Sequence, residues 1–148
     1  MDAVLELSGN VGTEVETKVT RGGWPTASFR VACTPRQRRG GEWGDAETIW
    51  LTVTCFRGLA ENVASSVSKG DPVLVNGRLR LSSWEDEHGE RRERLVLEAT
   101  TVGPDLTRGT STFRRSERPV VEDETDEAYR ELILSVEQEP EPAAAVAG

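Results

Sequence analysis

One segment near the middle of the chain alternates aromatic and hydroxyl side chains with aliphatic ones. In an extended strand over residues 49–56, the aliphatic set would face a core and the other set would face outward. The outward set consists of Trp50, Thr52, Thr54 and Phe56. Large rings on the polar face of a strand lose the burial of a core position, and unpaired nucleobases are flat ligands that could stack on them. Cover by a helix, a loop or a partner subunit is the alternative.

A second segment, residues 73–84, places arginines and a tryptophan on one face of a predicted strand. This face carries Arg78, Arg80 and Trp84. Guanidinium groups attract phosphates and stack on bases, so arginines interleaved with aromatics are typical of a groove for single-stranded nucleic acid. The opposite, core-facing parity is expected to consist of Val73, Val75, Leu79 and Leu81.

Five strands and one helix are expected to position these residues. The sequence predicts strands at about 3–20, 26–34, 49–56, 73–84 and 94–102, with a bend or bulge in the first at Gly9 and Gly12. A helix is predicted at about 59–67, where apolar residues recur at helical spacing. Three strands, a helix and a hairpin follow this order in the OB-fold, a five-stranded all-β barrel that binds oligonucleotides.

The segment 35–45 is predicted to be a loop, and it is basic. It carries Arg36, Arg38, Arg39 and Trp43 and leads directly into the aromatic strand. A solubilising loop is the commoner role of such a charge run. Arg57, directly after the aromatic strand, is a further candidate for contacts to nucleic acid.

The net charge of −8 is unevenly distributed along the 148 residues. Residues 1–112 hold 14 Lys and Arg against 16 Asp and Glu, whereas residues 113–148 hold 4 against 10. Binding to nucleic acid would therefore depend on the local placement of arginines. We expect a binding domain over 1–106 and a largely disordered acidic tail over 107–148. The alternative for the tail is a short amphipathic helix through Tyr129, Leu132, Ile133 and Val136.

Catalysis is disfavoured by the residue inventory. The only histidine, His88, falls in a predicted hairpin tip, and Cys33 and Cys55 lie on the apolar parity of their strands. Without a nucleophile beside a base, or a cluster of metal ligands, we expect no enzyme, no cofactor and no metal. The start of the chain is not leader-like and no apolar run could span a bilayer, which predicts a cytoplasmic protein.

Three stretches of the chain resemble the bacterial single-stranded DNA-binding protein family, over about residues 4–106. They are residues 58–63 (GLAENV), 69–79 (KGDPVLVNGRL) and 84–90 (WEDEHGE). The resemblance implies a nucleoid-associated homotetramer, usually a dimer of dimers, that protects single-stranded DNA during replication, recombination and repair. It also implies that bases stack on Trp50, Phe56 and Trp84, the same three aromatic residues that side-chain alternation places on the outward faces of their strands. Trp43 and Trp24 have no assignable counterpart, and for Trp24 packing and DNA contact both stay open.

Two departures from the family bear on function. Ser82 and Ser83 stand where basic residues are common, which implies fewer phosphate contacts. Residues 139–148 (EPEPAAAVAG) replace the acidic tip through which housekeeping members recruit repair enzymes, so we expect that recruitment to be absent. Residues 103–115 are similar to the short second paralogues of actinobacteria, which favours a specialised role. The alternative to single-stranded DNA binding is an OB-fold module that binds RNA or another protein. RNA stays open because no residue in the sequence clearly recognises the 2′-hydroxyl group that distinguishes RNA from DNA.

Overall fold

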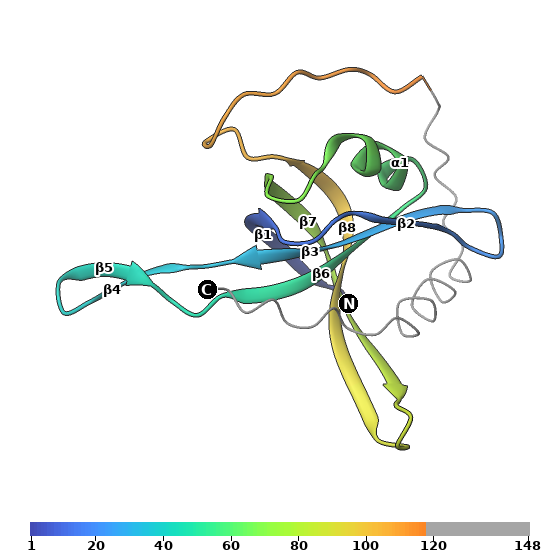
Figure 1. The fold of residues 1–148 in the computed structure, drawn as a ribbon, viewed down its shortest axis with the longest axis horizontal. Coiled ribbons are helices and arrows are strands. Elements are labelled where there is room, and N and C mark those ends of the chain that lie inside the picture. The colour runs from blue at the N-terminus through green and yellow to red at the C-terminus, as the bar shows by residue number, and fades with distance from the viewer. Residues whose placement is uncertain (118–148) are drawn as a thin grey trace.

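Eight strands and one helix make up the described part of the chain, residues 1–117 of the computed structural model (Figure 1). The strands are β1 (Ala3–Val11), β2 (Glu16–Val19), β3 (Pro25–Cys33), β4 (Arg36–Arg39), β5 (Glu42–Asp45), β6 (Ile49–Phe56), β7 (Pro72–Glu85) and β8 (Arg91–Pro104). The helix, α1 (Arg57–Ser66), lies between β6 and β7. The predicted acidic tail beyond residue 117, with its candidate helix at 129–136, lies outside the described residues.

Six of these strands form one sheet that closes into a barrel. The strand order is β1-β7-β8-β6-β3-β2, and β1 also pairs with β3. This extra pairing joins the ends of the five-stranded run β1-β7-β8-β6-β3 and leaves β2 as an extension of β3. Strands β6 and β8 are parallel, whereas the other pairs are antiparallel. The predicted OB-fold is therefore confirmed.

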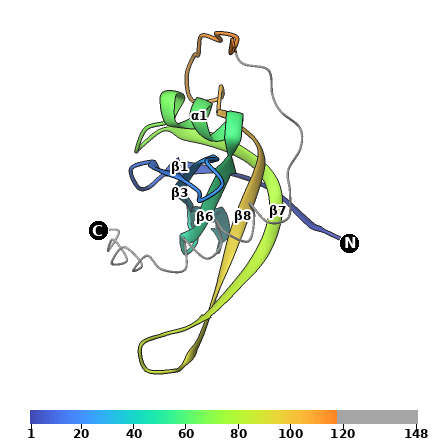
Figure 2. The ribbon, with the colours of Figure 1, turned by 90° about the vertical axis from the view of Figure 1, so that its right-hand side faces the viewer.

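The core lies inside the barrel and follows the predicted alternation of the central strands. Val31, Val53 and Leu97 are fully buried, and Phe29 and Cys55 join the same cluster. Helix α1 adds Ala60 and Val63 and closes one end of the barrel, while the β7–β8 hairpin extends from the other end (Figure 2). The helix is short, and no helix among the described residues is long and apolar enough to cross a membrane.

Two predicted elements differ from the structure. The first predicted strand is two strands, β1 and β2, separated by residues 12–15, so that the break begins at Gly12. The predicted loop at 35–45 is instead a separate two-stranded hairpin, β4–β5. Gly40 and Gly41 form its turn with φ of 59° and 85°. Because glycine adopts positive φ without steric cost, this Gly-Gly pair permits a tight hairpin turn.

The residues of β7 that were predicted to face the core do so only in the first half of the strand. Val73 and Val75 are buried, but Leu81 is 57% exposed and Ser82 is buried. Beyond Arg80 the two strands leave the barrel, so Leu81 and its cross-strand partner Leu95 have no core to face. The same reason applies to Ile49, which begins β6 at the rim of the barrel and is 58% exposed.

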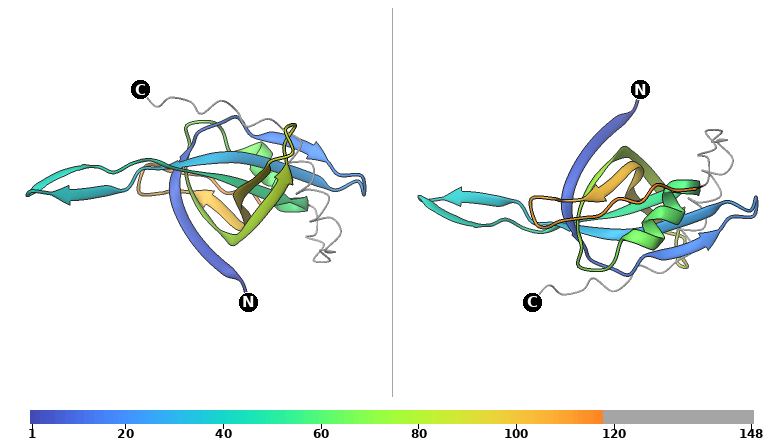
Figure 3. Two further views of the ribbon diagram at one scale, coloured as in Figure 1. Left: turned by 90° about the horizontal axis from the view of Figure 1, so that it is seen from below. Right: turned by 90° about the horizontal axis from the view of Figure 1, so that it is seen from above.

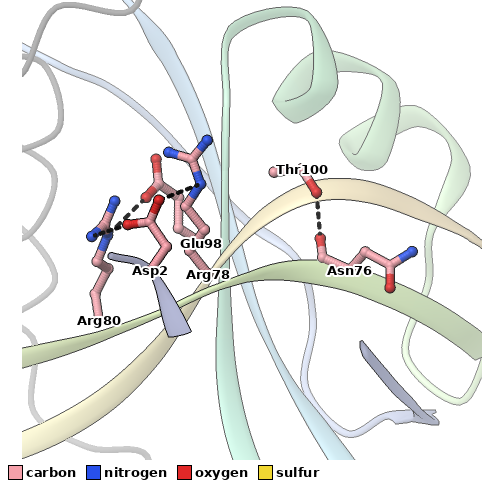
Figure 4. Close-up of polar contacts among 6 residues, drawn as sticks. All are labelled: Asp2, Asn76, Arg78, Arg80, Glu98 and Thr100. Carbon is pink, nitrogen blue, oxygen red and sulfur yellow. Dashed lines mark hydrogen bonds and ion pairs between the residues drawn. The ribbon is translucent and has the colours of Figure 1, made fainter. Parts of the chain in front are cut away.

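A β-bulge marks the change of register in the β7–β8 pair. The pairing shifts between Asn76 and Gly77, and the extra residue on β8 is Thr100, whose hydroxyl donates to the Asn76 carbonyl oxygen at 3.0 Å (Figure 4). A Cβ at Gly77 would collide with the Glu98 carbonyl group. Glycine therefore allows the close approach of the two backbones at this bulge.

Candidate nucleic-acid interface

The strand registers combine the two predicted binding faces into one outer surface. Directly paired residues of neighbouring strands point to the same side of a sheet. One row of neighbours across β7, β8, β6 and β3 consists of Arg80, Val96, Thr52 and Arg30. The next row consists of Arg78, Glu98, Thr54 and Ser28. The aromatic face of β6 and the arginine face of β7 therefore lie on the same side of the sheet, which we call the outer face, although Thr54, Val96 and Glu98 within it are buried.

Trp50 has a defined orientation on this outer face. The ring is half-buried, and Gly12 lies so close to it that an added Cβ would collide with the ring carbons. The guanidinium carbon of Arg30 lies 5.1 Å from the ring centroid. The segment after β1 also holds the Arg30 backbone, because the Arg30 N–H donates to Thr13 Oγ1 at 3.0 Å and the Gly12 N–H donates to the Arg30 carbonyl at 2.8 Å. The ring is thus positioned next to a cation.

A hollow of about 530 Å³ lies between Trp50 and the base of the β7–β8 hairpin. Trp50, Arg30 and Thr52 contribute to one side, and Leu81, Arg94 and Leu95 contribute to the other. Apolar groups and two cationic groups therefore line the same hollow, together with the acidic side chain of Glu93. A nucleotide presents the matching combination of a flat base and an anionic phosphate.

Trp84 lies on the projecting β7–β8 hairpin. It is half-buried, and the guanidinium carbon of Arg94 is 5.4 Å from its ring centroid. At the tip, the carboxylate of Asp86 accepts hydrogen bonds from the Glu90 and His88 backbone N–H groups and from Arg92 Nε, each at 2.9 Å. These hydrogen bonds lower the pKa of the Asp86 carboxyl group, and the bond from the Glu90 N–H has the largest effect. His88 is in the tip, as predicted.

Phe56 and Arg57 lie at the other end of β6. Phe56 is half-buried and pairs with Thr26 of β3. Arg57 begins α1, and its guanidinium carbon lies 3.9 Å from the ring centroid of Trp24. Trp24 is thus close to predicted site residues at this end of the strand.

Arg78 and Arg80 have acidic partners within the chain. Arg80 contacts Glu98 Oε2 through Nε at 3.3 Å and Asp2 Oδ1 through Nη1 at 3.4 Å (Figure 4). Arg78 Nε lies 3.9 Å from Asp2 Oδ2. The Glu98 side chain is only 11% exposed, so it lies beneath the arginines rather than in solvent. The positive charge of these two arginines is therefore partly balanced before any ligand binds.

The remaining predicted residues lie on the β4–β5 hairpin, which extends from the side of the barrel along the long axis of the molecule (Figure 3). Trp43 is 64% exposed and sits directly opposite Arg38. Arg38 Nε donates to the Gly41 carbonyl at 3.2 Å, and Arg36 lies 4.0 Å from Asp45. Arg39 is exposed and pairs with Glu42. These residues form a basic arm separate from the outer face.

Arg30 and Arg94 were not among the residues selected from the sequence, although both lie against a predicted stacking ring. For Arg30 a signal was present, because Cys33 lies on the apolar parity of the same predicted strand and Arg30, three residues earlier, falls on the opposite, outward parity. Arg94 is the first residue of the last predicted strand, and the alternation of side chains there did not indicate on which face of the strand it lies. Its proximity to Trp84 depends on the pairing of β7 with β8.

Comparisons with known proteins give consistent results. The model of the single-strand binding protein family matches residues 3–105. Single-stranded DNA-binding proteins of Corynebacterium glutamicum and Mycolicibacterium smegmatis are 41% and 37% identical over 119 residues, 79% of this chain. The chain spans 53% of the first relative's length and 72% of the second's.

Two solved structures share the fold. The small single-stranded DNA-binding protein of Streptomyces coelicolor has a TM-score of 0.65 at 35% identity, covering 73% of this chain and 98% of that one. The second single-stranded DNA-binding protein of Mycobacterium smegmatis has a TM-score of 0.59 at 29% identity, covering 78% of this chain and 100% of that one. Both relatives are described as small or second proteins of their kind, in line with the resemblance of residues 103–115.

Proposed function

The chain belongs to the single-strand binding protein family, and on this premise we propose that it binds single-stranded DNA without sequence preference. The observation that carries the proposal is the strand register, which places Trp50 and Phe56 on the outer side of the barrel and Trp84 on the hairpin that continues from it, with arginines on the same strands. Every base has a π-face, so stacking on aromatic rings tolerates any sequence. The proposed action is binding without a chemical step, as the family description states binding alone.

Base stacking and charge are supplied together in this proposal. The rings of Trp50 and Trp84 each lie near a guanidinium, from Arg30 and Arg94 respectively. A base that stacks on either ring brings its phosphate close to a positive charge. Phosphate contacts carry no sequence information, so they strengthen binding to every sequence equally.

The basic arm extends the proposed site beyond the barrel. Trp43 and Arg38 are cross-strand neighbours, and Arg36 and Arg39 flank them on β4. The arm continues in the direction of β3 and β6, along the long axis of the molecule (Figure 1). A single strand that follows β6 could therefore pass onto the arm.

For the assembly and the cellular role, the resemblance supports a finer proposal. We propose a homotetramer, a dimer of dimers, that is cytoplasmic and nucleoid-associated and that has a specialised part in replication, recombination or repair. Residues 1–106 would bind DNA, and the acidic tail would not recruit repair enzymes through the housekeeping tip. Light scattering on the purified chain measures the proposed mass directly.

The proposed function is tested by titrating intrinsic tryptophan fluorescence with oligo(dT) and with poly(U) at several salt concentrations. We expect saturable quenching by oligo(dT), and affinity that falls as salt rises. The variant Trp50→Ala, Trp84→Ala should bind more weakly by about 1–3 kcal/mol for each ring removed. Phe113→Ala is the matched control, because Phe113 is an exposed aromatic residue outside the proposed site.

Three outcomes would contradict parts of this proposal. Full affinity in the folded double variant would exclude stacking on these two rings. Preference for poly(U) over oligo(dT) at equal salt would favour an RNA-binding module. No binding to either polymer would favour a protein-interaction module.

A further inference from the structure

Trp24 is held by the turn between β2 and β3. The Thr20 N–H donates to the Trp24 carbonyl at 2.9 Å, and the Trp24 N–H donates to Thr20 Oγ1 at 3.1 Å. Gly23 adopts a φ of 83°, which glycine reaches without steric cost, and Gly22 packs beside the indole. The ring is half-buried. The turn therefore fixes both the backbone and one edge of the ring.

Arg57, whose guanidinium group lies over this ring, has a backbone conformation that is unusual for arginine. Its φ is 54°, and it is the only non-glycine residue with positive φ among residues 1–117. Glycine would adopt this conformation at no steric cost, and Gly58 is the next residue. A non-glycine residue in the left-handed region is uncommon. Its presence here indicates that the arginine side chain makes an interaction that glycine could not make. Its guanidinium carbon lies 3.9 Å from the Trp24 ring centroid.

The Trp24–Arg57 pair continues the line of aromatic residues on the outer face. Phe56 precedes Arg57 and pairs with Thr26, two residues after Trp24. Trp50 and Phe56 are six residues apart along β6, a rise of about 20 Å. The β2–β3 turn lies at the end of the long axis opposite the basic arm (Figures 1 and 3). A strand of DNA that follows β6 away from the arm would reach this pair after Phe56.

We propose that Trp24 is a positioning residue for Arg57 and that the Trp24–Arg57 pair extends the single-stranded DNA site beyond Phe56. The inference rests on the proposed function and adds a contact at the far end of the site. A guanidinium stacked on an indole has less freedom to lose when it binds. It can take a base on its plane or a phosphate on its N–H edge.

A double-mutant cycle on the full chain tests this role, with oligo(dT) affinity as the readout. Trp24→Ala should weaken binding about threefold to fivefold, the effect of losing an exposed cation–π contact. Arg57→Ala should weaken it about tenfold, as expected for a lost charge-assisted contact. The double variant should bind no more weakly than Arg57→Ala alone, because Trp24 acts through Arg57.

Conservative variants separate positioning from folding. Arg57→Lys keeps the charge but not the planar stack, so it should match Trp24→Ala in affinity. Trp24→Phe keeps a ring and should stay near the wild type. Arg21→Ala removes an exposed arginine from the same turn and is the control for charge. If Trp24→Ala does not fold, as judged by circular dichroism, Arg57→Lys and Trp24→Phe carry the test.

Wild-type affinity in Trp24→Ala or in Arg57→Lys would overturn the inference. Losses of affinity that add up in the double variant would also overturn it, because Trp24 would then act independently of Arg57. A loss of stability in Trp24→Ala without a loss of affinity would show that the pair only fastens the turn to the helix. A wild-type chain that does not bind oligo(dT) at all would instead refute the proposed function.

Discussion

At the scale of single residues, Asp2 occupies the position in which a phosphate would meet Arg78 and Arg80. Asp2→Ala should therefore raise oligo(dT) affinity, about twofold at low salt, because exposed ion pairs are weak and easily displaced. The gain should fade in high salt. Titration at two salt concentrations measures it. Glu6→Ala is the control, since Glu6 is exposed on β1, which directly follows Asp2, and carries the same charge. Weaker binding in Asp2→Ala would show that Asp2 orients the arginines instead.

A second prediction at this scale concerns the glycine beneath Trp50. Gly12→Ala should shift the Trp50 ring, because the added Cβ would collide with it. Overpacking of this kind costs about 1–3 kcal/mol of stability. We expect weaker oligo(dT) binding together with a lower midpoint in urea unfolding. Gly109→Ala, at a position with open space, is the control. Unchanged affinity would mean that the position of the ring does not limit binding.

Cys55 gives a third prediction, on pH. Burial raises the pKa of its thiol from 9.0 to about 12. Above pH 9 the unfolded chain loses this proton while the folded chain keeps it, so the free energy of unfolding should fall as pH rises from about 9 to about 12. Urea unfolding at pH 8 and pH 10 measures the change, and Cys55→Ala should remove this component. Equal pH dependence in the variant would assign the effect to other groups.

At the scale of elements, the β4–β5 arm is a separate sheet whose side chains contribute no buried residue to the barrel core. Arg38→Ala, Arg39→Ala should therefore leave the fold intact and weaken binding to all sequences. Each phosphate contact to single-stranded DNA contributes about 0.7 to the slope of log affinity against log salt, so two contacts contribute about 1.4. Arg108→Ala, Arg114→Ala removes equal charge outside residues 1–106. An unchanged slope in the arm variant would place the DNA elsewhere.

At the scale of the whole molecule, residues 113–148 carry 4 basic and 10 acidic residues and should repel DNA. Truncation after Arg115 is expected to raise oligo(dT) affinity at low salt, and the gain should shrink as the Debye length shortens to about 8 Å at physiological ionic strength. Light scattering should give the same oligomeric state for both forms. Weaker binding, or dissociation to dimers, would make the tail a structural element.

The sequence by itself predicted the features that depend on near neighbours along the chain. Alternation along β6 identified Trp50 and Phe56 as outward and Val53 and Cys55 as inward, because successive side chains of a strand point to opposite faces. The order of three strands, a helix and a hairpin predicted the barrel. The sequence also contained the Gly40-Gly41 turn, although the segment around it was interpreted as a loop.

Only the tertiary structure decided which distant residues meet. The contact of Asp2 with Arg80 joins β7 to a residue 78 positions away, and the contacts of Arg30 with Trp50 and of Arg57 with Trp24 depend on the pairing of β3 with β6. Leu81 was predicted to face the core and is exposed, because alternation gives the face of a strand but not the point where it leaves the barrel. That point is set by strand pairing across the whole sheet, which no local pattern of residues contains.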